Sequence, residues 1–355
     1  MILDVFLSFL AHFMHPYYQI GGIIATSAML IILLYGPRGK FKSTDSAPNI
    51  LPNIPKKQTA GTESAIEVNV GLYIINFPTF DMIANRFIAD IVLWFELDPS
   101  LMPLETVQKF SFERGTILSK SEADMKIVGN KLFVKYSIRL QFTTDLDHRL
   151  FPFNDHKMFI ILKNEYVSPN ELLFTASRSS FRVEPNIQTS DWNIVDRATE
   201  TGYFQAQLHA FETEKIIQYP AVIFSIDLAK KGMRRIFIIM LPMIILFFIS
   251  VLTFSLDPKI ESRSILTLST GTLTGLIAYR FVIEKIVPDV GYFTRADHLF
   301  NLFLTVIFIT FLVNLFAVNW GVHDTFLLAV KGLTLVVVEL IVLASFYYLQ
   351  REAHE

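Results

Sequence analysis

The sequence of 355 residues contains no cysteine. Disulfides, thiolate metal sites and cysteine nucleophiles are therefore excluded together. Charged residues are scarce at 18%, and 31 Lys+Arg against 33 Asp+Glu leave no basic excess of the kind that nucleic-acid binding needs. Hydrophobic residues, in contrast, make up 52% of the chain, and Phe alone occurs 33 times. This composition predicts a membrane protein with a sizeable polar part.

Catalytic signatures are missing as well. The sequence has no Gly-rich phosphate loop, no nucleophile elbow and no His/carboxylate spacing suited to a metal ion. We therefore expect neither an enzyme nor a protein that carries a cofactor or a metal ion.

Long apolar runs are present instead, and a run of about 18 residues or more can cross a bilayer as a helix. The first run is longer than the apolar part of a signal peptide, so we expect a retained anchor behind an interfacial segment, together spanning residues 1–38. Hydroxyl residues make one further run doubtful, and Glu339 in the last run is an ionisable group at membrane depth, for which Asn301 and Asn314 are candidate partners. The clear runs are Tyr17–Tyr35, Ile236–Leu256, Leu299–Val318 and Phe326–Leu349, and the doubtful one is Ile265–Val287.

Between the first two runs the chain changes character. Residues 39–61 are rich in Pro, Lys, Ser and Asn and predict a linker. Residues 62–231 alternate apolar and polar side chains over short stretches separated by turn residues, which predicts an immunoglobulin-like β-sandwich. Residues 232–355 then form a membrane domain. The predicted strands include Ile66–Ile74, Phe87–Phe95, Lys131–Phe142, Lys157–Leu162, Tyr203–Ala210 and Tyr219–Leu228.

The doubtful run, which we take as helix 264–287, has a small and polar face. Steps of three and four residues along that face give Thr267, Gly271, Thr274, Ala278 and Phe281. Such a face can line water, in which case several chains must form a ring, because each chain supplies one such helix. Alternatively, Gly271-x-x-x-Gly275 is a small-residue motif through which two helices pack closely. The residues alone leave both explanations open.

Several motifs together resemble one family. The stretch Asp145-Leu-Asp-His-Arg-Leu-Phe-Pro-Phe-Asn-Asp-His-Lys157 is similar to the signature loop of pentameric ligand-gated ion channels, the Cys-loop receptor superfamily, without its two cysteines, as in bacterial members. Further similarities follow in the family's order over about residues 66–349. They are Arg86–Trp94, Ser190-Asp191-Trp192, Gln218–Ile226, Pro242, and Pro288 with Tyr292 and Asp297.

The resemblance implies a homopentamer in a bacterial inner membrane, with four pore-domain helices and a periplasmic or extracellular sandwich. Small molecules or protons would act as agonists between subunits and would open a central pore lined by helix 264–287. The basic residues on both sides of the polar region favour a cytoplasmic sandwich instead. The resemblance accounts for Lys230–Arg235 as the family's basic segment before the membrane, but it leaves Arg38–Lys42 unexplained.

The resemblance also implies residues that couple agonist binding to the pore. Lys230 takes the family's basic position, and its expected partners are Asp81 and the acid after Phe151-Pro152-Phe153. That acid is replaced by Asn154, with Asp155 next to it. Pro288 and Tyr292 match the loop that follows the pore-lining helix. Surface charges without a role are the alternative.

In the pore, the resemblance puts Thr274 at the usual apolar gate position. Hydroxyl groups do not dewet a channel, so we expect the gate at a ring of Phe281. Glu261 near the inner end and Glu284 near the outer end give a weak preference for cations.

Aromatic residues are the candidate agonist contacts, because π faces attract cations. The alternative for each phenylalanine is a place in the sandwich core. The candidates are Trp94, Phe110, Phe174, Phe181 and Phe211, with Phe112 nearby. A different function is also compatible with the residues: a non-conducting pentameric receptor that signals through the additional N-terminal helix.

Overall fold

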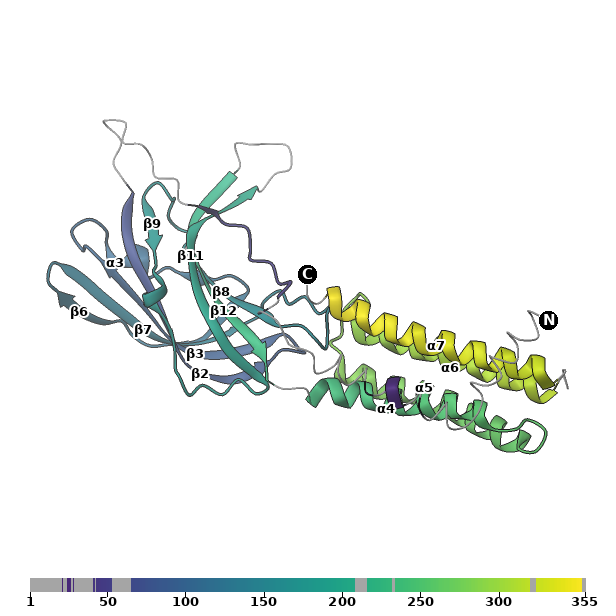
Figure 1. Cartoon of the computed structure of the whole chain (residues 1–355). Helices are drawn as coiled ribbons and strands as arrows, with labels where there is room; N and C mark the ends of the chain where they lie inside the picture. The colour runs from purple at the N-terminus through teal and green to yellow at the C-terminus, as the bar shows by residue number, and fades with distance from the viewer. Residues whose placement is uncertain are drawn as a thin grey trace. The chain divides into compact units, whose positions relative to one another are not determined.

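The computed structural model describes two compact units (Figure 1). The sheet-rich unit comprises the described residues among Phe41–Asp147 and Asp155–Gly232, and the helical unit those among Met1–Lys40, His148–Asn154 and Met233–Glu355. Residues 148–154, predicted as part of the sandwich, therefore belong to the helical unit. The described residues are 21, 24–26, 28, 41, 43–52, 65–207, 216–231, 234–319 and 324–352.

The sheet-rich unit holds two sheets that form a sandwich-like fold, as the alternating pattern predicted. One sheet has the order β1-β11-β12-β8-β4, and the other has the order β10-β2-β3-β7-β5, with β6 paired to β7 and β9 paired to β2. The elements are β1 (Leu51–Pro52), β2 (Ile66–Asp81), β3 (Arg86–Leu97), the short helix α3 (Leu104–Val107), β4 (Ser111–Phe112), β5 (Gly115–Lys120), β6 (Asp124–Val128), β7 (Lys131–Phe142), β8 (His156–Lys163), β9 (Leu172–Thr175), the 3₁₀ turn η1 (Arg178–Ser180), β10 (Phe181–Val183), β11 (Trp192–Gln207) and β12 (Ile216–Lys230).

Every second side chain of the long strands points into the core. β3 alternates buried and partly buried positions along nearly its whole length, because successive residues of a strand face opposite sides of the sheet. On the other side of the sheet, Gly71 lies opposite Trp94 in the β2–β3 pairing. A Cβ atom at Gly71 would come within 2.1 Å of the indole ring, so only glycine leaves room for Trp94 there.

Part of the predicted linker belongs to a sheet. Leu51–Pro52 is strand β1, and it pairs antiparallel with β11 at Gly202 and Tyr203. The residues before it, from Ser43, have no regular secondary structure.

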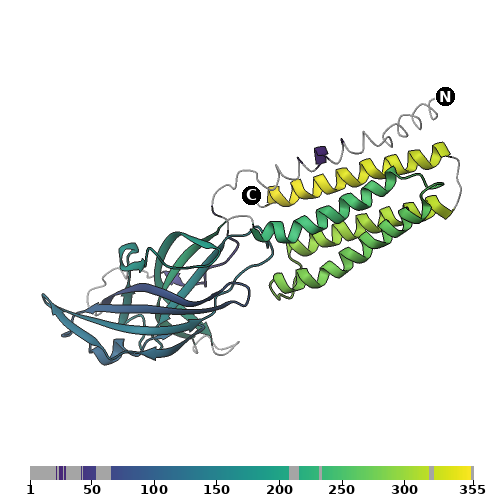
Figure 2. The ribbon, with the colours of Figure 1, turned by 90° about the horizontal axis from the view of Figure 1, so that it is seen from below.

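The helical unit contains α4 (Arg234–Leu252), the 3₁₀ turn η3 (Thr253–Ser255), α5 (Ser262–Ile286), α6 (Arg295–Asn319) and α7 (Asp324–Glu352). α5 packs against α4 and α6, and α6 packs against α7 (Figure 2). Three helical segments in the described part of the chain are long and apolar enough to cross a membrane: Arg234–Ser255, Ser262–Ile286 and Arg295–Asn319. The doubtful predicted span is thus a continuous helix. Most of the first predicted span, Tyr17–Tyr35, lies outside the described residues.

Candidate functional site

The exposed side of α5 carries all the residues predicted to line a pore. Thr267, Gly271, Thr274 and Ala278 are exposed in the single chain, and Phe281 is 67% exposed. The opposite side of the helix is buried against the other helices of the unit. Its buried residues are Ile265, Ser269, Thr272, Leu276 and Ile283. The small and hydroxyl residues of the predicted face therefore make no extensive contact within the chain and are accessible to solvent, lipid or another subunit.

The hydroxyl residues of α5 divide into two groups, which the sequence did not distinguish. Ser269 and Thr272 point inward, where Asn314 Nδ2 of α6 donates to Ser269 Oγ at 3.0 Å and to Thr253 Oγ1 of η3 at 2.6 Å. Thr272 Oγ1 donates to the carbonyl of Ser269 at 3.0 Å. These bonds give the inward hydroxyls and the Asn314 Nδ2 group partners within the apolar unit, while Asn314 Oδ1 is buried without one among the described residues. The inward group is structural, which leaves Ser264, Thr267, Thr270 and Thr274 as the exposed hydroxyl residues of α5.

The two glycines of the small-residue motif have different surroundings. A Cβ atom at Gly275 would lie 3.3 Å from Leu246 Cδ2 of α4, so this glycine allows close packing within the chain. A Cβ atom at Gly271 would meet no atom within 4 Å. Close helix packing therefore accounts for Gly275 and leaves Gly271 on the exposed face.

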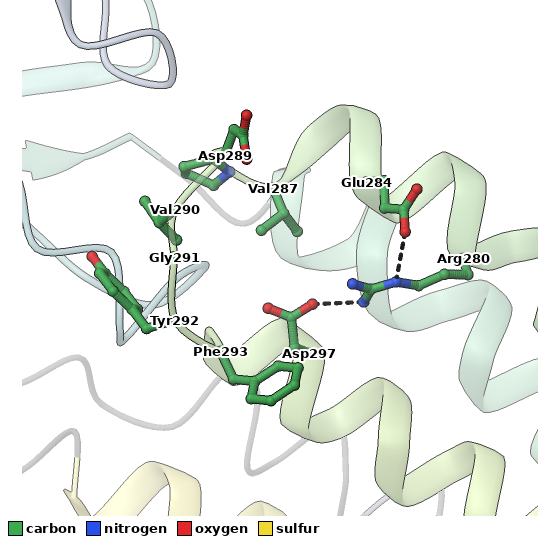
Figure 3. A pocket seen from close by; sticks show the side chains of 10 residues that line it. Arg280, Glu284, Val287, Asp289, Val290, Gly291, Tyr292, Phe293 and Asp297 are labelled. Carbon is green, nitrogen blue, oxygen red and sulfur yellow. Dashed lines mark hydrogen bonds and ion pairs between the residues drawn. The ribbon is translucent and has the colours of Figure 1, made fainter.

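An open cleft of about 640 Å³ lies where α5 turns into α6 (Figure 3). Arg280 connects the two helices there: its Nη1 lies 2.6 Å from Asp297 Oδ1, and its Nε lies 3.2 Å from Glu284 Oε1. Pro288 and Tyr292, both predicted coupling residues, line the same cleft. Of the two selectivity candidates, Glu284 thus lies beside this cleft, whereas Glu261 is the exposed residue that precedes α5.

The first turn of α6 is closed by a capping box that was not among the features predicted from the sequence. The N–H and Oγ1 of Thr294 donate to Asp297 Oδ2 at 2.8 and 2.7 Å, and the N–H of Asp297 lies 3.3 Å from Thr294 Oγ1. The Thr-x-x-Asp pattern before an apolar run is the signal that could have identified it. Asp297 therefore fixes both the start of α6 and the guanidinium of α5.

The segment 148–154 is attached to the same end of the helical unit. The N–H of Arg295 donates to the carbonyl of Arg149 at 3.0 Å, and the N–H of Ala296 donates to that of Phe151 at 3.1 Å. The first amides of a helix lack partners within the helix, and here the loop carbonyls supply them.

Side chains reinforce this attachment. Tyr292 Oη accepts the N–H of His148 at 2.9 Å, and the Arg149 guanidinium lies 5.5 Å from the centre of the Tyr292 ring. Phe151 is 4% exposed within the apolar core of the helices, with Phe153 packed against that core. Pro152 and Asn154 are buried. The predicted coupling residues Phe151, Pro152, Phe153, Asn154, Pro288 and Tyr292 therefore all lie in the helical unit.

The remaining predicted coupling residues lie in the sheet-rich unit. Asp155 Oδ1 accepts the backbone N–H of Lys230 at 3.1 Å, which brings these two together. The Lys230 ammonium lies 5.9 Å from the centre of the Trp192 ring. Asp81 instead closes its own turn, since Oδ1 accepts the N–H groups of Ile83 and Ala84, both at 2.9 Å.

Most of the aromatic ligand candidates form part of the sandwich core. Phe110, Phe112, Phe174 and Phe181 belong to the buried cluster between the sheets, so the alternative of a core role is confirmed for them. Trp94 is partly buried above Gly71. Phe211 lies outside the described residues.

One ammonium group already contacts aromatic rings in this region. Lys120 Nζ lies 4.2 Å from the centre of the Phe110 ring and 4.4 Å from that of Tyr136, and it also contacts the Gln108 carbonyl at 3.4 Å. Burial lowers the pKa of the Lys120 ammonium. The cation that these two ring faces attract is therefore supplied by the chain itself.

Two ionisable groups of α7 lie in the helical unit. Glu339 forms a hydrogen bond with Thr26 of the N-terminal segment, whereas its candidate partner Asn314 contacts Thr253 and Ser269. Lys331 is 1% exposed, and its Nζ donates to the carbonyl of Leu256 at 3.3 Å. The N-terminal segment thus has a polar contact with the last helix.

No protein-family model matches the chain, and no curated protein matches it.

Proposed function

We propose that the chain is one subunit of a pentameric ligand-gated ion channel and that α5 lines its pore. The observation that carries the proposal is the exposed side of α5, where threonine, glycine and alanine follow one another from Thr267 to Ala278 in the middle of a membrane-length helix. One chain supplies one such face, and a ring of copies encloses it around a water-filled path. The inward hydroxyls already have partners within the chain, so the outward ones are those left for water.

The attachment of residues 148–154 to α6 supports coupling between ligand binding and this pore. The carbonyls of Arg149 and Phe151 accept the first amides of α6, and Tyr292 from the α5–α6 loop binds the amide of His148. A displacement of the 148–154 segment would therefore be transmitted to the end of α5. The agonist would be a small molecule or protons, and it would bind between adjacent sandwiches.

A ring of Phe281 is the proposed gate. Threonine hydroxyls at position 274 bind water, whereas large apolar rings around a narrow path exclude it. We expect Phe281→Ala to raise the current of the unstimulated channel, measured in planar bilayers. Val282→Ala is the matched control, because Val282 is also exposed but is rotated by about 100° around the helix. A wild-type leak in Phe281→Ala would contradict this position of the gate.

Charge selectivity follows from the acidic residues near the pore ends. Glu284 is 55% exposed at its side chain and lies beyond Phe281 on α5, so a ring of such carboxylates would favour cations. The reversal potential in a salt gradient measures this preference, and Glu284→Gln should shift it toward zero. A reversal potential on the anion side would contradict a cation channel.

A second candidate function is a non-conducting pentameric receptor that signals through the N-terminal segment. The contact between Thr26 and Glu339 favours it, because this contact connects that segment to the last helix. Recording currents from the purified protein across pH and a panel of small molecules separates the two functions. Currents under any of these conditions support the channel, whereas silence together with five-fold particles supports the receptor.

The proposed location is a bacterial inner membrane with the sandwich on the periplasmic side. Single-particle images of the solubilised protein along its symmetry axis test the subunit number. Five-fold particles are expected, and monomers would rule out both candidate functions. Protease accessibility of the sandwich in sealed vesicles tests the orientation.

A further inference from the structure

The segment that precedes the sandwich contains a buried carboxylate, that of Asp45. It binds two backbone amides that lie more than 100 residues further along the chain. Asp45 Oδ1 accepts the N–H of Asp147 at 2.5 Å, and Oδ2 accepts the N–H of Lys157 at 2.7 Å. Oδ2 also lies 3.0 Å from His156 Nδ1 and accepts Ser43 Oγ at 2.7 Å. All of these residues belong to the sheet-rich unit.

The side chains of this arrangement are almost fully buried, so the hydrogen bonds between them are part of the interior of the fold. The Asp45 side chain is 0% exposed and that of His156 is 2% exposed. An ionised carboxylate is costly to bury unless hydrogen bonds and charge compensate it, and bonds to an ionised acceptor are stronger than neutral ones. The imidazole that faces Asp45 is itself held against the Trp192 ring, with the ring centres 5.3 Å apart.

The two amides stand on opposite sides of the loop that joins the two units. Asp147 is the last residue before segment 148–154, and Lys157 follows soon after it, at the start of β8. One carboxylate therefore holds the beginning and the end of this loop. The chain has no cysteine, so no disulfide bond can close the loop in this way.

We propose that Asp45 is a positioning residue that clasps the two ends of the 147–157 loop from the segment preceding the sandwich. The clasp gives this segment a role in addition to connecting the N-terminal part of the chain to the sandwich: it sets the geometry from which residues 148–154 leave the sheet-rich unit. Any effect on gating rests on the proposed channel function, whereas closure of the loop does not.

Hydrogen exchange of the full-length protein in detergent tests the clasp at single amides. Asp45→Ala removes both acceptor oxygens, so exchange at the amides of Asp147 and Lys157 should accelerate about tenfold or more. Asp45→Asn retains one acceptor oxygen, so at least one of the two amides should accelerate. Ser43→Ala is the matched control, because it removes one donor to the carboxylate and leaves both amide bonds in place.

Unchanged exchange at both amides in a folded Asp45→Ala protein would overturn the clasp. Where Asp45→Ala does not fold, Asp45→Asn decides instead, since it preserves the size of the side chain. Unchanged exchange at both amides in that variant would overturn the proposal equally. An acceleration in Ser43→Ala as large as in Asp45→Ala would also contradict the proposal. The hydrogen bonds from the two amides to Asp45 would then not be what protects these amides from exchange.

A second readout separates the clasp from the channel function. In a conducting protein, Asp45→Asn should shift the agonist or proton concentration for half-maximal current and leave the single-channel conductance unchanged, because no pore residue is altered. A change in conductance without that shift would contradict a positioning role. Where the wild type carries no current, the channel proposal fails, and the exchange result still decides the clasp.

Discussion

Removal of the Asp297 carboxylate tests how the end of α5 is held. Asp297 Oδ1 contacts Arg280 Nη1 at 2.6 Å, while Oδ2 accepts the N–H and Oγ1 of Thr294 at 2.8 and 2.7 Å. Only 8% of the Asp297 side chain is exposed, against 32% for Arg280. Asp297→Ala therefore removes an acceptor that serves a helix terminus and a guanidinium at once.

The expected loss of stability is about 2.5–4 kcal/mol. Loss of the capping interactions costs about 1 kcal/mol, and loss of the charge-assisted bond to Arg280 costs about 1.5–3 kcal/mol. Arg280 keeps Glu284 at 3.2 Å and the Phe300 ring at 5.3 Å, so its charge is not left without contacts.

Glu284→Ala is the matched control, since it removes the other carboxylate from the same guanidinium. Glu284 is 55% exposed and lies four residues along the same helix, so its loss should cost only about 0.3–0.5 kcal/mol. The free energy of unfolding of each variant can be measured by SDS titration in mild detergent. Equal losses in the two variants, or a larger loss for Glu284→Ala, would refute this reasoning.

Three further changes have defined outcomes. Asn314→Leu removes the donor to the buried hydroxyls of Ser269 and Thr253, of which Thr253 keeps its bond to the Ser250 carbonyl, and should lower the free energy of unfolding by about 1–3 kcal/mol in the same titration; an unchanged value would contradict a structural role for this polar contact. Gly71→Ala should displace the Trp94 ring and alter its fluorescence, because the new Cβ would lie 2.1 Å from the indole; Gly271→Ala, which meets no atom within 4 Å and lies in a regular helix, should leave the fluorescence unchanged. Burial alone would raise the pKa of Asp45, but the hydrogen bond and charge of His156, with the two backbone amides, hold this pKa below its usual 3.8. An aspartate with a lowered folded-state pKa stabilises the fold above about pH 4, and this contribution is lost as the pH falls through the folded-state value. Below about pH 4 the wild type should therefore lose more unfolding free energy than Asp45→Asn. Parallel curves of unfolding free energy against pH would contradict this prediction.

The elements with a strong pattern were predictable from the sequence. Ile66–Ile74 and Phe87–Phe95 alternate regularly because one side of each strand is buried, and both lie within observed strands. The hydroxyl-rich stretch was doubtful as a membrane span, and it is the helix Ser262–Ile286. Which hydroxyl residues of this helix point inward and which point outward was not predictable. Ser269 and Thr270 are adjacent hydroxyl residues, and only the fold shows that Ser269 faces Asn314 of another helix.

Contacts between residues far apart in the sequence could not be inferred either. Ser43–Leu51 is a polar stretch without periodicity, so nothing in the sequence indicated that Asp45 becomes buried against Asp147 and Lys157. The early part of β11 carries polar residues on both faces and was missed as a strand, although it is paired with β12. The boundary between the two units could not be predicted for the same reason. Residues 148–154 belong to the helical unit because Phe151 packs into the core of the helices, a contact between residues far apart in the sequence.

Reaction of a single introduced thiol tests most directly whether α5 lines water. The chain contains no cysteine, so Thr274→Cys and Leu276→Cys each carry one thiol, on the exposed face and on the buried face of the same helix. A charged, membrane-impermeant thiol reagent should modify Thr274→Cys rapidly and reduce its current, while Leu276→Cys stays unmodified. A Thr274→Cys protein that remains unmodified under every condition, or that reacts no faster than Leu276→Cys, would contradict a water-filled pore along α5.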